Sequence, residues 1–414
     1  MLNCRNNNNI VLNGSKLYQT LKKLLLHKLR SITLTLSVLF PVVALGQVIG
    51  TGGTNTNGSN SGAIITGVPF LNITPDSRSG AMGEAGVALS PDVNANFWNP
   101  SKLAFLENNN SLAISYSPWL RKLVPDVSLS YLSYAHKVDD RNSIGASLRY
   151  FNLGSIQLVD ANQQDMGTYT PSEFSIDGSF ARKFGKEFSL GLTMRYIHSS
   201  LYNGSFSGGQ QTSAVNDIAA DVSLFYQHPG ELFGKPSLFA FGTNISNIGP
   251  KINYTSGGQN YYLPTNLKIG AANTLNIDEY SQLTVTLDIN KLLVPTTRYD
   301  ASGNITSGDK SVPSAIFGSF SDAPGGASEE FKEISYSPGL EYWYNKQFAL
   351  RAGYFYENPS KGNRQYLTLG AGLKYDIFDL DFAYLAASQQ KSPLANTLRF
   401  SVLINFLSGK PKTK

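Results

Sequence analysis

The feature that most constrains this chain is a period-two alternation of apolar and polar residues, repeated in segments of about ten residues. The stretch 366–375 is typical, because Leu369 and Leu373 share one face while Thr368 and Lys374 share the other. Such alternation predicts β-strands with one apolar and one polar face. Fourteen segments follow this pattern, at 111–117, 127–137, 142–153, 172–184, 187–199, 216–228, 236–247, 262–274, 281–291, 334–344, 347–358, 364–375, 378–387 and 395–406.

The connections between these segments alternate in length. Short turns are expected at 138–141, 185–186, 229–235, 275–280, 345–346 and 376–377, and long links at 154–171, 200–215, 248–261 and 292–333. Outer-membrane barrels have an even number of strands, with short turns at the periplasmic end and long loops at the outer end. The pattern therefore predicts an all-β fold, a 14-stranded antiparallel transmembrane β-barrel spanning residues 111–406. Both chain ends would then be periplasmic, and 407–414 a periplasmic tail.

A soluble secreted β-sandwich or propeller would also show alternation, so the character of the two faces matters. Charged residues make up 15% of the chain, below the roughly 25% typical of soluble domains. The polar faces mix charged side chains with Gly, Ser and Thr, and the apolar faces are aromatic near their ends, which suits a hydrated lumen and a lipid exterior. We expect Arg351, Lys374 and Arg399 to face the lumen. The side chains expected to meet lipid are Leu350, Ala352, Leu369, Leu373, Phe400 and Val402.

The first 46 residues have the pattern of a secretory signal peptide. They contain six basic residues, all before an apolar run at 31–45, and no acidic residue. Cleavage is expected before Gln47. A transmembrane anchor is the alternative, but the run is short for a span of about 20 residues and Pro41 interrupts it. Removing residues 1–46 changes the formal net charge from +5 to −1, which removes the electrostatic reason for binding nucleic acid. Residues 47–66 are expected to be a flexible lead-in.

The residues that usually carry catalysis or bind metals are scarce. The single cysteine, Cys4, lies in the signal peptide, so the mature chain has no disulfide and no thiol chemistry. His136, His198 and His228 lie in separate segments without the spacing of metal ligands. We therefore expect no metal, no cofactor and no catalytic residue, and interpret the chain as a protein that is not an enzyme.

Residues 67–110 differ from the strands that follow, because they are rich in Gly and Asn but also carry apolar residues. Glycines allow close backbone approach, and asparagine side chains can satisfy backbone groups in irregular turns. A fourteen-stranded barrel is wide enough to leave a lumen. We therefore predict an N-terminal plug, or hatch, inside the barrel, against the alternative of an ordinary periplasmic lead-in. Its motif residues are Arg78, Gly80, Met82, Gly83, Asn99 and Pro100.

This segment resembles the N-terminal hatch of FadL-like barrels, through Ala81-Met82-Gly83-Glu84-Ala85 and Asn99-Pro100-Ser101. It is more closely similar to the PorV family (also called LptO), outer-membrane proteins of the type IX secretion system of Bacteroidota. The stretches 67–83, 97–103 and 115–120 carry that resemblance, which extends over essentially the whole mature chain. The PorQ-type barrels share the fold, so a paralogue of that type remains open.

The resemblance implies a role in protein secretion at the bacterial cell outer membrane. PorV-like proteins bind the C-terminal signal domain of secreted cargo. They collect the cargo at the translocon pore protein and carry it to the proteins of the surface attachment complex. Outer-membrane lipid is the other expected partner. The alternative is a FadL-like outer-membrane transporter of hydrophobic small molecules, which would need an apolar pocket and a path through the barrel wall.

Two outer loops are the candidate regions for cargo or partner binding. We expect Trp119 to be exposed in the first outer loop, where such a ring is either a partner hot spot or a membrane-belt anchor. The link 292–333 is long and irregular, as solvent-facing functional loops often are. The candidate residues are Pro118, Trp119, Leu120, Pro295, Pro313 and Phe317.

Overall fold

The computed structural model describes residues 62–119, 126–159, 164–201, 204–205, 211–298, 307, 310–387 and 397–406. The predicted signal peptide, the lead-in as far as residue 61, the candidate Leu120 and the predicted tail 407–414 lie outside the described residues.

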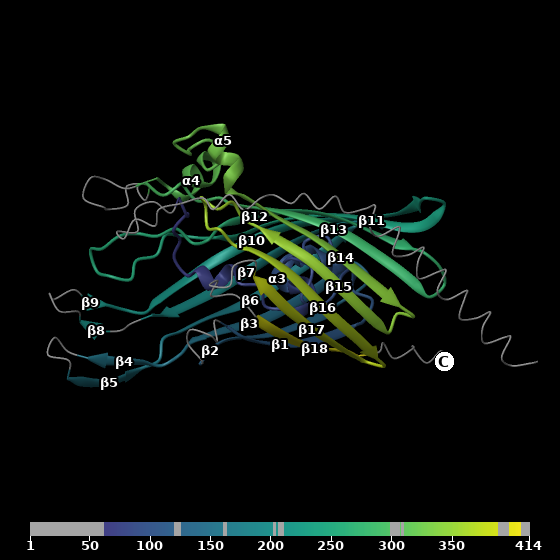
Figure 1. Cartoon of the computed structure of the whole chain (residues 1–414), viewed down its shortest axis with the longest axis horizontal. Coiled ribbons are helices and arrows are strands. Elements are labelled where there is room, and N and C mark those ends of the chain that lie inside the picture. The colour runs from purple at the N-terminus through teal and green to yellow at the C-terminus, as the bar shows by residue number, and fades with distance from the viewer. Residues whose placement is uncertain are drawn as a thin grey trace, which may run out of the picture. The chain divides into compact units, whose positions relative to one another are not determined.

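Fourteen strands of the described chain pair into one closed antiparallel barrel (Figure 1). The first and last strands pair from Asn110 with Phe406 to Tyr116 with Phe400, which closes the sheet without leaving an edge. The predicted fourteen-stranded antiparallel barrel is confirmed. The strands are β1 Asn110–Pro118, β2 Val127–Lys137, β3 Asn142–Leu153, β6 Ser172–Phe184, β7 Phe188–Ser200, β10 Val215–Leu232, β11 Lys235–Ile248, β12 Asn266–Asn276, β13 Ser281–Leu292, β14 Ile334–Tyr344, β15 Phe348–Tyr356, β16 Gln365–Tyr375, β17 Phe378–Ala387 and β18 Thr397–Phe406.

The alternating faces point as the sequence predicts. Leu350, Leu369 and Phe400 are 66%, 46% and 47% exposed on the outer surface, whereas Arg351 and Arg399 are buried inside. Leu373 and Val402 are likewise exposed and Ala352 is half-buried. Lys374 shares the inner face of β16 with Thr368, but it lies at the strand end, where its side chain is 45% exposed beside Asp379. Barrel closure therefore leaves an apolar band for lipid around a charged interior.

One predicted strand start is wrong. Residues 262–265 were expected to open the strand that became β12, but this strand begins at Asn266. Pro264 has no N–H to donate to a sheet ladder. Tyr262 instead accepts a hydrogen bond from the Gly67 nitrogen at 2.9 Å, and its buried ring packs with Val294.

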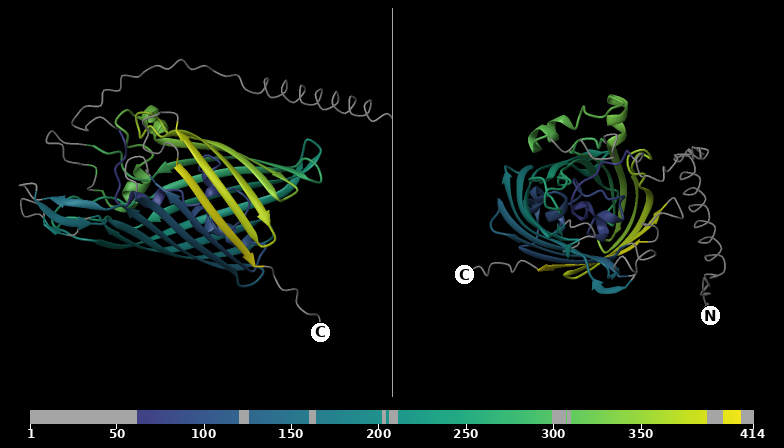
Figure 2. Two further views of the ribbon diagram at one scale, coloured as in Figure 1. Left: turned by 60° about the horizontal axis from the view of Figure 1, so that its bottom comes forward. Right: turned by 90° about the vertical axis from the view of Figure 1, so that its left-hand side faces the viewer.

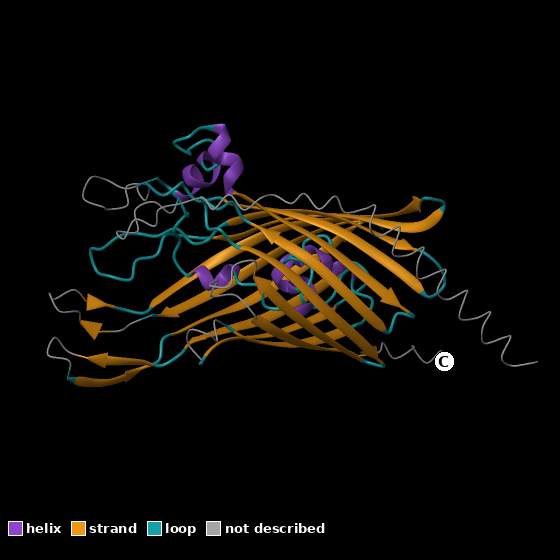
Figure 3. Cartoon of the chain, in the orientation of Figure 1, coloured by secondary structure: helices purple, strands orange, loops and turns teal. Residues whose placement is uncertain are grey.

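The two ends of the barrel differ in their connections. Tight turns join the strands at one end, where residues such as Asn345 and Asp376 take positive φ angles. At the other end, two links expected as plain loops form ribbons, β4 Ile156–Val159 with β5 Asp165–Tyr169 and β8 Gly204–Ser205 with β9 Gln211–Thr212 (Figure 3). The predicted link 292–333 carries α4 Val312–Gly318, α5 Ala327–Glu330 and η4 Phe331–Glu333. No described helix is long and apolar enough to cross a membrane.

The segment before β1 lies within the ring of strands (Figure 2). It contains four short helices, and most of its side chains are buried, including Met82 and Leu103 at 0% exposure. Its first half packs against β16, β17 and β18, and its second half against β6, β7 and β10. The barrel interior is therefore a packed core built from this segment and the inner faces of the strands. The helices are η1 Pro69–Asn72, α2 Ser77–Gly80, α3 Ala95–Trp98 and η2 Pro100–Phe105.

Candidate functional site

A buried ion network joins the interior segment to the barrel wall. Arg78 donates from Nε and Nη2 to both carboxylate oxygens of Glu341, at 2.9 and 2.8 Å. Glu341 also accepts from Arg351 at 2.7 Å, and Arg351 in turn donates to Asp381 at 2.6 Å. Arg78 reaches Asp92 of its own segment at 3.0 Å. The motif arginine is therefore held by carboxylates of β14 and of its own segment, and Arg351 and Asp381 extend the network to β15 and β17.

Backbone groups of the segment are satisfied by further inward-facing side chains. Asp288 of β13 accepts from the nitrogens of Gly86 and Val87, at 2.7 and 2.8 Å. Lys102 donates to the Gly86 carbonyl at 2.7 Å, and Asn99 to the Val87 carbonyl at 3.0 Å. Burial, which outweighs the attraction of nearby carboxylates, lowers the pKa of Lys102 to about 8. These contacts give the backbone N–H and carbonyl groups of Gly86 and Val87 hydrogen-bond partners inside the lumen.

Three glycines allow the segment to touch the wall. A Cβ atom at Gly353 of β15 would lie 2.1 Å from the nitrogen of Gly83 and the carbonyl carbon of Met82. Gly83 itself has a φ of 71°, in the left-handed region that glycine tolerates best. A Cβ atom at Gly80 would likewise lie 2.5 Å from the Nη1 atom of Arg399. The Gly and Met positions of the motif are thus contact points between backbone and barrel, and all six motif residues are buried.

We expect Gly353→Ala to displace the segment from the wall, because the new methyl group would overlap main-chain atoms rather than a flexible side chain. Overpacking of this kind costs about 1–3 kcal/mol. Trypsin cleavage after Arg78 or Lys102, which are buried in the native chain, would report the displacement. Gly178→Ala is the matched control, because its Cβ would meet nothing within 4 Å. Equal protection of the two variants would contradict the prediction.

Trp119 does not lie where it was expected. We predicted an exposed ring, but the side chain is 9% exposed, so this expectation is wrong. The Trp119 nitrogen donates to the Val127 carbonyl at 2.9 Å, which extends the β1–β2 pairing and keeps the inward alternation of β1. The ring packs in the cluster that contains Phe70 and lies 5.6 Å from the Arg399 guanidinium carbon. It is therefore a core residue, and its neighbour Pro118 ends β1 half-buried.

The long loop carries exposed aromatic residues. Phe317 of α4 is 78% exposed, and Phe320 and Phe331 are 51% and 68% exposed. Pro313, another predicted residue, is also exposed, whereas Pro295 is buried at the base of the loop. Sequence reasoning missed Phe320 and Phe331, although three phenylalanines in an otherwise polar stretch were a usable signal.

Buried ion pairs hold this loop in place. Lys291, at the end of β13, pairs with Glu330 at 3.0 Å and Glu333 at 2.7 Å. Lys361, in the next loop at the same end of the barrel, pairs with Glu329 at 2.6 Å and with Glu333 at 3.0 Å. The hydrogen bond from Lys361 holds the pKa of the Glu329 carboxyl below its usual range. These ion pairs therefore fix the loop that carries the exposed phenylalanines to the barrel.

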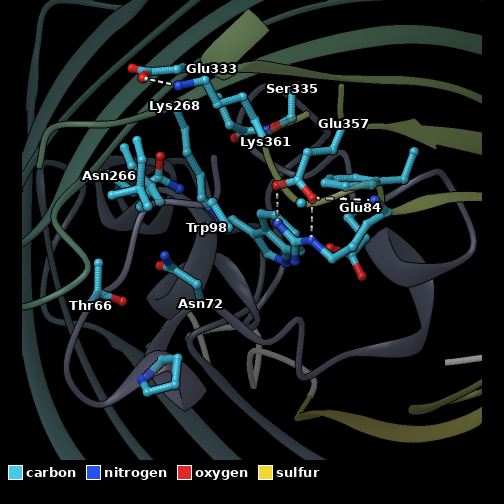
Figure 4. Close-up of a pocket in the computed structure, with 18 residues that line it drawn as sticks. Thr66, Asn72, Glu84, Trp98, Asn266, Lys268, Glu333, Ser335, Glu357 and Lys361 are labelled. Atoms are coloured by element: carbon cyan, nitrogen blue, oxygen red, sulfur yellow. Dashed lines mark hydrogen bonds and ion pairs between the residues drawn. The ribbon is translucent and has the colours of Figure 1, made fainter. Parts of the chain in front are cut away.

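A cavity of about 310 Å³ lies between the interior segment and the loop end of the barrel (Figure 4). Six charged residues are part of its wall, together with Trp98 and Phe355. The ammonium group of Lys268 lies 4.4 Å from the centre of the Trp98 ring. The charged residues are Glu84, Lys268, Glu333, Glu357, Lys361 and Arg364.

The described residues contain no group of three His, Cys, Asp or Glu side chains that could hold a metal ion. The histidines make pairwise contacts instead. His136 and His198 contact Asn110 and Asn216, each at 2.8 Å, and His228 contacts Glu187 at 3.0 Å.

Comparison with known proteins connects the fold to a family. A family model described as type IX secretion system protein PorV matches residues 56–299. No curated protein matches. Similar solved structures include the toluene transporter TodX of P. putida, at 12% identity over 81% of this chain and 99% of that one, with a TM-score of 0.49. The toluene transporter TbuX of Ralstonia pickettii matches at 13% identity over 80% and 98%, with a TM-score of 0.43.

A FadL homologue of Pseudomonas aeruginosa is similar at 12% identity over 81% of this chain and 99% of that one, with a TM-score of 0.41. Likenesses this distant carry no argument about function. The family match is different in kind, because it covers the interior segment, β1 to β13 and the start of the long loop, which is more than half of the 414 residues. This transmembrane β-barrel of the outer membrane therefore belongs to the PorV family of type IX secretion system proteins.

Proposed function

We propose that this protein binds the C-terminal signal domain of secreted cargo and carries it from the translocon pore protein to the surface attachment complex. Family membership supports a role in type IX secretion, and the filled barrel interior suits a carrier better than a wide conduit. In this proposal the end with long loops faces the cell exterior, and both chain ends face the periplasm.

The proposal rests mainly on Phe317, an exposed ring on a loop that ion pairs fix to the end of the barrel with the long loops. Its ring is 78% exposed, on a loop that buried ion pairs connect to β13 and to Lys361. Binding energy at protein interfaces is concentrated in a few large side chains at the centre of the contact. A ring that is already positioned loses less conformational entropy when a partner covers it.

The cavity argues against the transporter of hydrophobic molecules. Such a transporter needs a mostly apolar pocket with few polar groups. Six of the side chains around the 310 Å³ cavity are charged. Burying an alkyl chain beside these groups would remove water from charges without giving them new partners. We therefore favour the cargo carrier over the transporter.

We expect Phe317→Ala to weaken binding to cargo signal domain by roughly thirtyfold, corresponding to about 2 kcal/mol for a hot-spot ring. The measurement is the affinity of the detergent-solubilised barrel for a purified C-terminal signal domain, with heat-modifiability on a gel to show that the barrel has folded. Phe233→Ala is the matched control, because Phe233 is 88% exposed in the tight turn between β10 and β11, at the opposite end.

The control variant should bind cargo as the unchanged protein does. If Phe317→Ala binds normally, or if Phe233→Ala loses as much affinity, the loop end is not the cargo surface. The same pair of variants tested against the translocon pore protein would then show whether Phe317 serves that partner instead.

A further inference from the structure

Four polar side chains form a continuous array on the cavity wall. Lys268 of β12 pairs in register with Asn290 of β13, which pairs in register with Ser335 of β14. Residues directly opposite on neighbouring strands have side chains on the same face, with Cβ atoms about 5 Å apart. Asn266 lies two residues before Lys268, so it shares that face. All four residues line the cavity (Figure 4 labels three of them).

The lysine of this array has no acidic partner among the described residues. Lys268 is 7% exposed, and its Nζ atom lies near the rings of Trp98 and Phe97, at 4.4 and 4.9 Å from their centres. The other cations around the cavity are neutralised, since Lys361 pairs with Glu333 and Arg364 with Glu357. A buried ammonium group without a carboxylate partner is costly unless a ligand supplies the counter-charge.

The two asparagines also have unused hydrogen-bonding capacity. The side-chain oxygens of Asn266 and Asn290 are buried and have no hydrogen-bond partner. Each of these oxygens can accept a hydrogen bond from an N–H or O–H group of a ligand. They lie on the same wall as Lys268, so a ligand that reaches the ammonium group can also reach them.

The size and position of the cavity suit a small molecule. Its volume of about 310 Å³ lies at the lower end of the roughly 300–1,000 Å³ typical of ligand pockets. Of the cations that line the cavity, Arg364 has a side chain that is 48% exposed, whereas Lys268 is 7% exposed. A ligand would therefore enter beside Arg364 and place its charged group against Lys268.

We propose that this cavity binds a small hydroxylated carboxylate. The carboxylate accepts hydrogen bonds from Lys268, and hydroxyl groups donate to the oxygens of Asn266 and Asn290. The apolar face of the carbon chain lies against Trp98. This site goes beyond the cargo role and does not depend on it.

The probe is sodium gluconate, titrated into the detergent-solubilised full-length chain. Replacing Trp119 and Trp343 by Phe leaves Trp98, in the cavity wall, as the reporter of intrinsic fluorescence, because the chain has three tryptophans. Calorimetry on the unsubstituted protein gives a second measurement. Sorbitol supplies hydroxyls without a carboxylate, and hexanoate supplies a carboxylate without hydroxyls, all at matched ionic strength.

We expect saturable binding of gluconate, weaker binding of hexanoate and weaker binding still of sorbitol. Lys268→Met should reduce the affinity for gluconate by about tenfold or more, as expected when a charge-assisted hydrogen bond is lost. Asn290→Ala should weaken the binding of gluconate but leave the binding of hexanoate unchanged. This variant also tests the proposal if Lys268→Met does not fold. The proposal is overturned if neither measurement saturates, if sorbitol binds as well as gluconate, or if hexanoate binds more tightly than gluconate.

Discussion

Replacing Glu341 by alanine is expected to destabilise the folded barrel by about 3–5 kcal/mol, the usual cost of removing one partner from a buried ion network. The Glu341 carboxylate is 1% exposed and lies between the guanidinium groups of Arg78 and Arg351. Without it, Arg351 retains Asp381 and Arg78 retains Asp92, but each has lost its hydrogen-bonded partner on β14. Two like charges would then face each other in a poorly solvated interior.

The variant should therefore unfold at lower denaturant concentration, and its interior segment should become accessible to protease. Urea titration of the detergent-solubilised barrel, followed on a gel by heat-modifiability, gives the change in the free energy of unfolding. Asp140→Asn is the matched control, because Asp140 forms an ion pair with Lys137 at 3.4 Å but is fully exposed. Exposed pairs contribute little to stability. If the two variants have the same stability, the buried network does not hold the segment.

A second large effect is expected on the outer surface. Leu369→Arg should cost about 2–4 kcal/mol if the side chain lies near the bilayer midplane, because a guanidinium group there has no water or counter-charge. Leu369 is 46% exposed in the middle of β16, and it pairs in register with Ala352 on one side and Tyr384 on the other. The measurement is folding into lipid vesicles across a denaturant series.

The control introduces the same arginine at the end of a strand instead of in its middle. Phe348, also outward-facing and 56% exposed, begins β15 beside the tight turn at residues 345–347. An arginine at this strand end can reach the interface, where the cost falls to about 0–1 kcal/mol. Phe348→Arg should therefore fold far better than Leu369→Arg. The reverse order would show that the membrane surrounds a different level of the barrel.

Most of the barrel could be predicted from local pattern. The strands β2, β3, β6, β14 and β17 have the predicted bounds, because period-two alternation between turn residues specifies a strand and its faces at once. The ribbons β4–β5 and β8–β9 were missed. They are short and carry little alternation, and they form because paired strands continue past the barrel end.

The candidate site was predicted less completely. Phe317 and Pro313 are exposed on the long loop, as a solvent-facing loop requires. Trp119 was misplaced, because a residue two positions after the predicted strand 111–117 was assumed to lie in the loop, whereas backbone pairing with Val127 keeps it in the wall. One residue of register reverses the direction of a side chain in a strand. Leu120 lies outside the described residues, so its role stays a prediction.

The sequence by itself determined the strand count, the alternation of short and long connections, and which face of each strand meets lipid. These properties depend on residues within about ten positions of each other, so a single chain displays them directly. Tertiary structure decided which inward side chains meet. Arg78 reaches Glu341 across 263 residues, and Lys268, Asn290 and Ser335 align only because three strands pair in one register. Alternation shows that a charge points inward, but only barrel closure and register determine whether it forms an ion pair or, like Lys268, forms none with the described residues.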